Sequence, residues 1–350
     1  MLRSALIRFV QLARQSLQAL KRRLRSIPAV RGLLDEAGEQ AAFADPSVHE
    51  AMLADTVRMD AYHAAIRRNI KPGDVVVDLG TGTGILALLA AQQNPRVVHA
   101  IDSSNIVSLA ARLVQANRVG NIRIHRVNSR RFRLEEPVDV IVHEQIGNAL
   151  FDEGMVEKIL DLKERLLKET GMILPGRFEL FLEPACVRKD YRVPYLWENK
   201  IHGVDFASLK GSPEYGIHHL FHSSALGVSH SAIDYFLCDA APVLAFDLNE
   251  IEDPAEIPTT IPVVRTVRRS GTLDGFCVYF RVIFDHEVSF DTSPFSPRTH
   301  WSNSLFRVEA RQCLEGEILA YTLDMKEPVR VESWSVRMED ARRARDSVPL

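Results

Sequence analysis

The segment from Val76 to Gly84 constrains the fold most, because an apolar run ends there in a glycine-rich turn that opens a helical stretch. From Asp74 to about Pro175, short apolar runs alternate with helical stretches, a pattern typical of a parallel sheet with helices on both faces. The predicted strands lie near 74–79, 97–102, 121–127 and 138–143 and from Gly171 onward, and the predicted helices near 84–93, 105–118 and 154–168.

The pattern changes after Pro175. Residues 177–187 and 260–338 contain alternating apolar and polar runs, typical of antiparallel strands in a barrel or sandwich. Residues 204–232 are rich in Gly, Ser and His, which indicates an excursion from this second domain. The predicted division is an N-terminal segment 1–40, an α/β domain 41–175, a β domain 176–340 and a tail 341–350.

Composition excludes several classes of protein. Hydrophobic residues make up 46% and charged residues 25%, which are ordinary globular values. The net charge of -3 gives no reason to expect nucleic-acid binding. The four cysteines are scattered without a CxxC pair, so neither a zinc site nor a disulfide framework is indicated. We expect a soluble protein of the reducing cytoplasm.

The first 31 residues carry eight Lys and Arg side chains and no acid. Leucines and other apolar residues recur there at helical spacing, which predicts a basic amphipathic helix. The segment lacks the continuous apolar run of a signal peptide or membrane span. Two roles remain open for it: packing on the protein or a partner, and contact with a membrane surface.

The glycine motif predicts a nucleoside site. Its glycines alternate at Gly80, Gly82 and Gly84. Asp102 ends the next predicted strand, 18 residues beyond Gly84, where an acid accepts hydrogen bonds from ribose hydroxyls. An NAD site would read GxGxxG, whereas the form Asp-x-Gly-x-Gly-x-Gly, which begins at Asp78, favours S-adenosylmethionine. The alternative is a glycine-rich turn in a unit that binds nothing.

Two carboxylates bound a loop after the fourth predicted strand. Glu144 lies at the carboxyl edge of the sheet, and Glu153 follows nine residues later, beyond Gly147. Carboxylates placed so close repel one another unless a cation joins them, and a guanidinium offers five donors in a fixed fork. The pair therefore predicts an arginine acceptor. The alternative for either acid alone is a helix cap or a solvated loop residue.

With these motifs the chain resembles the protein arginine methyltransferase family, over about residues 43–338. The matching segments are the double-Glu loop 143–155, the helix-like run 49–58, the domain exit 167–175, the residues 197–206 before the arm, and Thr299-His300-Trp301. The resemblance implies an α/β fold with a Rossmann-like class I methyltransferase domain, followed by an antiparallel β-barrel domain with an inserted dimerization arm. It also implies S-adenosylmethionine as cofactor and a homodimer.

The resemblance assigns roles by position. Around the cofactor it places Arg58, Asp78, Gly80, Gly82, Gly84, Asp102 and Met155, with Arg58 toward the cofactor carboxylate. As catalytic residues it places Glu144 and Glu153 on the substrate guanidinium and His300 paired with Asp55, and at the substrate pocket Met52 and Trp301. No metal is expected, since the four arm histidines (His218, His219, His222 and His230) have no acids or cysteines near them.

The chain departs from the family pattern at four places. The family's tyrosine-rich segment before the His49 helix is not recognisable in residues 41–47. The adenine-contacting acid after the third strand is replaced by Asn128, the usual Trp-Met after the first Glu is Gln145-Ile146, and the aromatic before the second is Asp152. Changed pocket walls leave the acceptor open between an arginine in a protein or peptide and free arginine or another small guanidine or amine. A further alternative is a catalytically inactive, cofactor-binding interaction protein.

Overall fold

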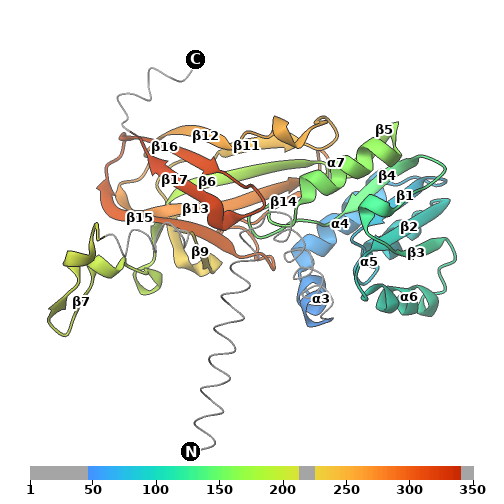
Figure 1. Cartoon of the computed structure of the whole chain (residues 1–350), viewed down its shortest axis with the longest axis horizontal. Helices are drawn as coiled ribbons and strands as arrows, with labels where there is room; N and C mark the ends of the chain where they lie inside the picture. Colours follow the sequence, from blue (N-terminus) through green and yellow to red (C-terminus); the bar gives the residue numbers. More distant parts are fainter. Residues whose placement is uncertain (1–45, 213–224, 340–350) are drawn as a thin grey trace, which may run out of the picture.

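The computed structural model describes residues 46–212 and 225–339. Figure 1 shows an α/β region near the start of the described chain and a long antiparallel β region beside it. The predicted succession of a parallel α/β domain and an antiparallel β domain is confirmed. The predicted basic helix at 1–31, the middle of the predicted arm (residues 204–232) and the tail from 341 lie outside the described residues.

The α/β domain contains one parallel sheet with the strand order β3-β2-β1-β4-β5. Its strands are β1 (Val75–Leu79), β2 (Val97–Asp102), β3 (Ile122–Arg126), β4 (Val138–His143) and β5 (Leu167–Leu174). The first four agree with the predicted bounds to within a residue, whereas β5 begins at Leu167 rather than Gly171. Parallel pairing places the carboxyl ends of β1, β2 and β4 at one edge, where the predicted site residues follow them.

The helices of this domain are α3 (Pro46–Leu53), α4 (Thr56–Asn69), α5 (Ile85–Ala91), α6 (Val107–Ala116) and α7 (Met155–Leu166). Apolar side chains at helical spacing bury one face of α7, from Met155 through Ile159 to Leu166. The helix-like run 49–58 is divided between α3 and α4. The division falls at Asp55, whose carboxylate accepts the backbone N–H of Arg58 at 3.0 Å and so caps α4.

The described part of the β domain contains two larger antiparallel sheets and one short hairpin, and β6 and β13 run through the middle of the largest sheet. The larger sheet has β6 (Arg177–Val187), β9 (Ala225–Val228), β10 (Ile233–Phe236), β11 (Pro242–Asp247), β13 (Gly271–Ile283), β14 (Ser289–Asp291) and β15 (Asn303–Cys313). The smaller has β12 (Thr260–Thr266), β16 (Ile318–Met325) and β17 (Trp334–Met338). An isolated bridge between Cys238 and Val267 links the segment after β10 to the segment after β12.

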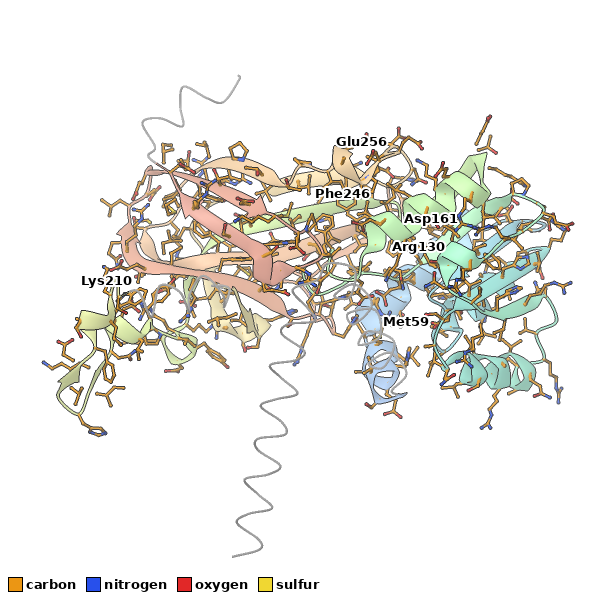
Figure 2. All side chains as sticks on the ribbon, in the orientation of Figure 1. Met59, Arg130, Asp161, Lys210, Phe246 and Glu256 are labelled. Atoms are coloured by element: carbon orange, nitrogen blue, oxygen red, sulfur yellow. The ribbon has the colours of Figure 1, made fainter. Side chains whose placement is uncertain are left out.

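Stacked aromatic rings join the two domains. Phe246 of β11, labelled in Figure 2, stacks on Phe178 of β6 and on Phe151 of the double-Glu loop, with ring centroids 5.4 and 5.5 Å apart. All three rings belong to one buried cluster that includes side chains of both sheets and of α7. The β domain therefore packs directly against the loop that carries Glu144 and Glu153, which restricts the loop's freedom to move.

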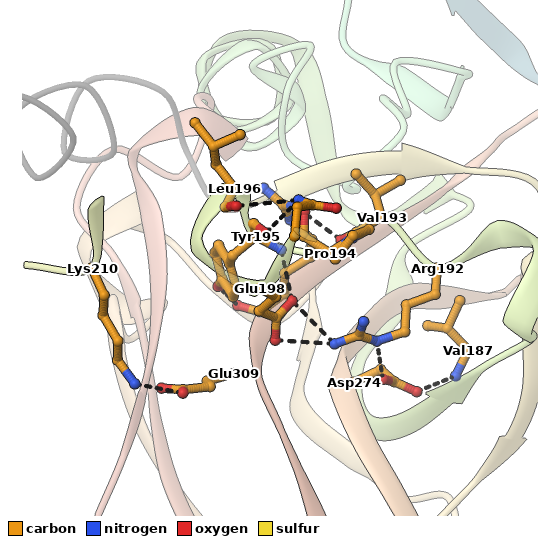
Figure 3. A network of polar contacts seen from close by, with 12 residues as sticks. Val187, Arg192, Val193, Pro194, Tyr195, Leu196, Glu198, Lys210, Asp274 and Glu309 are labelled. Atoms are coloured by element: carbon orange, nitrogen blue, oxygen red, sulfur yellow. Dashed lines mark hydrogen bonds and ion pairs between the residues drawn. The ribbon is translucent and has the colours of Figure 1, made fainter. Parts of the chain in front are cut away.

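The segment before the predicted arm is anchored by the polar network of Figure 3. Arg192 donates to Asp274 at 2.9 Å and to Glu198 at 3.1 Å, and Lys210 pairs with Glu309. The short strands β7 (Lys200–Ile201) and β8 (Val204–Asp205) form a hairpin beyond this network. At the other end of the predicted arm, β9 pairs with β15 and so belongs to the larger sheet.

Short 3-10 helices connect several of these elements: η1 (Ser129–Arg131), η2 (Lys189–Tyr191), η3 (Leu196–Glu198), η4 (Ala207–Leu209), η5 (His230–Ala232), η6 (Pro254–Glu256) and η7 (Val331–Ser333). All four cysteines are free thiols. Within the described ranges, no helix has the length and apolar character needed to cross a membrane.

Because Glu183 is buried in the core of the β domain, we expect the stability of the protein to depend on pH. Burial raises the pKa of this carboxyl to about 7 from an ordinary 4.5, although its hydrogen bond from the Ala241 N–H opposes the shift. The folded protein therefore holds this proton more tightly than the unfolded chain. The free energy of unfolding is expected to fall as pH rises from about 4.5 to about 7.

Glu183→Gln retains an acceptor for Ala241 and removes the titration. Its melting temperature, measured by calorimetry between pH 5 and 8, is expected to fall less with pH than that of the wild type. Part of the slope remains, because burial also raises the pKa of Asp78 to about 7. Identical pH dependence in the two proteins would show that Glu183 ionises without cost in the fold.

Candidate active site

The glycine loop leaves β1 with a backbone that only glycine adopts easily. Gly80, Gly82 and Gly84 have φ values of 71°, 53° and 84°, and Gly84 precedes the first turn of α5. Asp78, fully buried at the end of β1, accepts the Thr81 hydroxyl at 2.5 Å and the Ala87 N–H at 3.0 Å. Asp78 thus ties the loop to α5 and fixes the turn in shape.

Asp102 lies beside this loop, as its place at the end of β2 predicts. One carboxylate oxygen accepts the Gly82 N–H at 3.1 Å and the other accepts the Ser104 N–H at 2.7 Å. At the end of β3, the Asn128 side chain caps η1 by accepting the Arg130 N–H at 3.0 Å. The neighbouring strand ends therefore present a carboxylate and an amide at one edge of the sheet.

Two residues outside the predicted site cover the glycine loop. A Cβ added to Gly80 would lie 2.3 Å from Nε2 of Gln145, and one added to Gly82 would lie 2.9 Å from Cε1 of His49. The absence of side chains at Gly80 and Gly82 therefore leaves room for close neighbours. The sequence signal for Gln145 was its position directly after Glu144, whereas His49 only marked the start of a helical run.

Glu144 binds a guanidinium in this structure, and that guanidinium belongs to Arg58. The Nη1 of Arg58 lies 2.6 Å from Oε2 of Glu144, and Nη2 donates to the carbonyl of Met52 at 2.7 Å. Both charged side chains are almost completely buried, with exposures of 5% and 7%. Burial raises the pKa of Glu144, while the charges of Arg58 and His300 oppose the shift.

The resemblance placed Arg58 toward the cofactor carboxylate and Glu144 toward the substrate. In the structure the two side chains form an ion pair. Arg58 therefore connects the predicted cofactor side of the site with the predicted substrate side. Nε of Arg58 is buried and has no hydrogen-bond partner within the described chain, which leaves this side chain one donor in reserve.

Tyr62 holds the end of β4, directly before Glu144. Its hydroxyl is buried and donates to the carbonyl of His143 at 2.9 Å. The pKa of Tyr62 is raised well above its ordinary value, first by burial and then by the negative charges of Glu144, Asp78 and Glu153, while Arg58 opposes them. The Tyr62 hydroxyl thus holds the carbonyl of the residue directly before Glu144.

His300 pairs with Asp55 as the resemblance implied. Nδ1 of His300 lies 2.9 Å from Oδ2 of Asp55, and the backbone N–H of His300 donates to the same oxygen at 2.8 Å. Burial alone would raise the pKa of Asp55, but the hydrogen bonds from His300 and from the Arg58 N–H outweigh it and lower the pKa. Asp55 is therefore ionised at neutral pH and orients the imidazole.

Trp301 fastens the β domain to the double-Glu loop. It is 3% exposed, and its indole N–H donates to the carbonyl of Ile146 at 2.8 Å. Met155 is fully buried at the start of α7, and Met52 is half-buried in α3. The predicted cofactor role of Met155 and the substrate roles of Met52 and Trp301 stay predictions.

Sequence reasoning treated Asp152 only as a replaced aromatic. Its carboxylate in fact lies inside the loop and accepts the N–H groups of Asn148 at 3.1 Å and Ala149 at 2.9 Å. Burial raises the pKa of this carboxyl, and these two donors oppose the shift. The sequence does contain an indication of this role. Asp152 lies four residues after the turn-forming pair Gly147-Asn148, and an Asp near a turn favours side-chain to backbone hydrogen bonds.

No group of three or more His, Cys, Asp and Glu side chains in residues 46–212 and 225–339 could hold a metal ion. Of the four arm histidines, His230 lies within these ranges, and its Nε2 is 3.2 Å from the carbonyl of Trp301. His218, His219 and His222 lie outside them.

Comparison with known proteins agrees with this geometry. The family model for the arginine methyltransferase oligomerization subdomain matches residues 180–339, and the model for ribosomal protein L11 methyltransferase (PrmA) matches residues 15–176. Protein arginine N-methyltransferase 6 of Danio rerio is 31% identical over 303 residues, covering 80% of this chain and 83% of the relative.

Two solved structures have the same fold. The Trypanosoma brucei PRMT1 enzyme-prozyme heterotetrameric complex with AdoHcy superposes with a TM-score of 0.73 at 25% identity, covering 86% of this chain and 96% of the other. Arabidopsis thaliana protein arginine methyltransferase 10 gives a TM-score of 0.68 at 25% identity, covering 81% and 89%. The chain thus belongs to the protein arginine N-methyltransferase family.

Proposed function

We propose that this protein transfers a methyl group from S-adenosylmethionine to a guanidino nitrogen of an arginine in a protein substrate. The observation that carries the proposal is the buried contact between Glu144 and the guanidinium of Arg58. In this contact a guanidinium lies against the loop acid, and both side chains are almost completely buried. Glu153, nine residues further along the same loop, would supply the second negative charge.

The residues around the glycine loop fit the cofactor. Gly80 and Gly82 shape the loop after β1 through their positive φ values, and Asp102 offers carboxylate oxygens at the place where ribose hydroxyls bind in such folds. Arg58, which the resemblance assigns to the carboxylate of the methionine portion, keeps its Nε–H as an available donor. When bound, S-adenosylmethionine supplies a methyl group activated by a sulfonium.

The two glutamates prepare the acceptor for reaction. A free guanidinium is a poor nucleophile because its positive charge is spread over three nitrogens. Carboxylates on two of its sides favour charge on the nitrogens they bind and leave electron density on the third. They also hold that nitrogen in line with the methyl group, and such alignment contributes a large part of the rate.

The pair of His300 and Asp55 provides a place for the released proton. Forming a nitrogen–carbon bond on the guanidinium leaves that nitrogen with a proton to lose. With Nδ1–H directed at Asp55, the His300 ring keeps Nε2 as an acceptor, and the Asp55 carboxylate would stabilise the imidazolium that forms.

We further propose a homodimer in the reducing cytoplasm. The β domain matches an oligomerization subdomain, and apolar side chains are exposed around the described beginning of the arm, at Tyr191, Val193, Leu196, Ile201 and Val204. Four free thiols accord with a reducing compartment. Light scattering of the intact chain tests the dimer, and a double exchange of Ile201 and Val204 for serine should weaken it.

The proposed reaction is tested with methyl-labelled S-adenosylmethionine. The purified protein is offered arginine-rich proteins and, separately, free arginine, and methylarginines are measured by mass spectrometry after hydrolysis. Label in the protein pool is the expected result. Label only in free arginine would redirect the assignment to a small-molecule acceptor. Cofactor binding with label in neither pool would contradict the activity.

A further inference from the structure

The loop between Glu144 and Glu153 is closed from within by Asp152. The chain turns back at a bridge between Gly147 and Leu150, whose N–H donates to the Gly147 carbonyl at 3.0 Å. The Asp152 carboxylate lies across this turn. One oxygen accepts the Asn148 N–H at 3.1 Å, and the other accepts the Ala149 N–H at 2.9 Å.

Gly147 makes room for that carboxylate. A Cβ at Gly147 would lie 2.1 Å from Oδ1 of Asp152, closer than any real contact. The φ of Gly147 is not in the positive region, so the backbone there accepts any residue. The requirement for glycine at this position is therefore the space that the Asp152 carboxylate occupies.

The β domain holds the outer side of the same loop. The indole of Trp301 donates to the Ile146 carbonyl at 2.8 Å, and the backbone N–H of Ser302 donates to Oδ1 of Asn148 at 3.2 Å. The first half of the loop, which begins at Glu144, is thus fixed from outside. Asp152 connects that fixed half to the second half, whose next residue is Glu153.

We propose that Asp152 is a positioning residue that sets the place of Glu153 relative to Glu144. Its carboxylate binds the backbone of the fixed half, so the peptide that leads into Glu153 is held at one distance from it. The inference rests on the proposed function, because the spacing of the two acids matters only if both bind one guanidinium. A displacement of about 1 Å in such a site costs on the order of 10²-fold in rate.

A double-mutant cycle between Asp152 and Gly147 tests this role. Asp152→Ala removes the carboxylate, and Gly147→Ala expels it from its place, so each is expected to lower kcat by about 10²-fold. The double variant is expected to be no slower than either single one, because both changes break the same contact. Asp152→Asn keeps one acceptor oxygen and should recover part of the loss.

Asp161→Asn serves as the matched control. Asp161 lies on α7 in an ion pair with Arg165 and touches no loop residue in the contacts of the described chain, so its exchange should leave turnover unchanged. Cofactor affinity, measured by calorimetry, should also stay unchanged in the Asp152 and Gly147 variants, since Gly82 and Asp102 lie outside the loop. A general loss of folding would instead lower kcat and cofactor affinity together.

A second readout does not depend on turnover. Amide hydrogen exchange at Asn148 and Ala149 should accelerate in Asp152→Ala and in Gly147→Ala and stay at the wild-type rate in Asp161→Asn. Wild-type kcat in Asp152→Ala, or additive losses in the double variant, would overturn the positioning role while the proposed function stands. Absence of arginine methylation by the wild type would overturn the proposed function itself.

Discussion

Replacing Glu153 with glutamine is expected to lower kcat/KM for an arginine-containing substrate by about 10²- to 10³-fold. Glutamine has the shape of the native side chain but no negative charge. The guanidinium would then lose one of the two charges that polarise it, and Glu144 would remain partly engaged with Arg58. Steady-state kinetics with labelled S-adenosylmethionine measure the loss.

The affinity for the cofactor should stay unchanged in Glu153→Gln. The hydrogen bonds of Asp102 go to the backbone of Gly82 and Ser104, which lie outside the double-Glu loop. Glu157→Gln is the matched control, since Glu157 is exposed in the first turn of α7, four residues along the same segment. Turnover of Glu153→Gln equal to that of Glu157→Gln would refute the two-carboxylate clamp.

The parallel sheet was predictable because its strands are buried on both faces. The residues of β1 are all buried, and the sequence there is a continuous apolar run interrupted only by Asp78. The site followed from the same pattern. Residues directly after parallel strands meet at one edge, so the positions of Gly80, Asp102 and Glu144 indicated a shared site before any contact was known.

Apart from the pairing of His300 with Asp55, the contacts that complete the site were not predictable, since they join distant residues or depend on loop shape. Arg58 and Glu144 are 86 residues apart, and their pairing requires the break between α3 and α4 at Asp55. The role of Asp152 depends on the turn that places the N–H groups of Asn148 and Ala149 around its carboxylate. The pairing of β9, within the predicted arm, with β15 of the larger sheet depends on the register between two strands that lie far apart in the sequence.

The His300 ring lies between a buried carboxylate and the protein surface. Its side chain is 20% exposed, whereas the Asp55 side chain behind it is 1% exposed. The buried carboxylate fixes Nδ1 through a 2.9 Å contact and also caps α4, so the imidazole is oriented by the same residue that positions the helix carrying Arg58. A proton taken by this ring has a route to solvent.

His300→Ala is therefore expected to lower kcat by about 10²-fold or more, the usual contribution of a general base, with cofactor affinity unchanged. His286→Ala is the control, because His286 is 79% exposed and pairs only with Glu287 in the described contacts. Added imidazole should restore part of the His300→Ala activity and have no effect on the control, since small bases can enter a partly exposed cavity left by the missing ring. A variant that retains full kcat would show that water accepts the proton unaided, and the contact with Asp55 would then serve only to hold the β domain against α4.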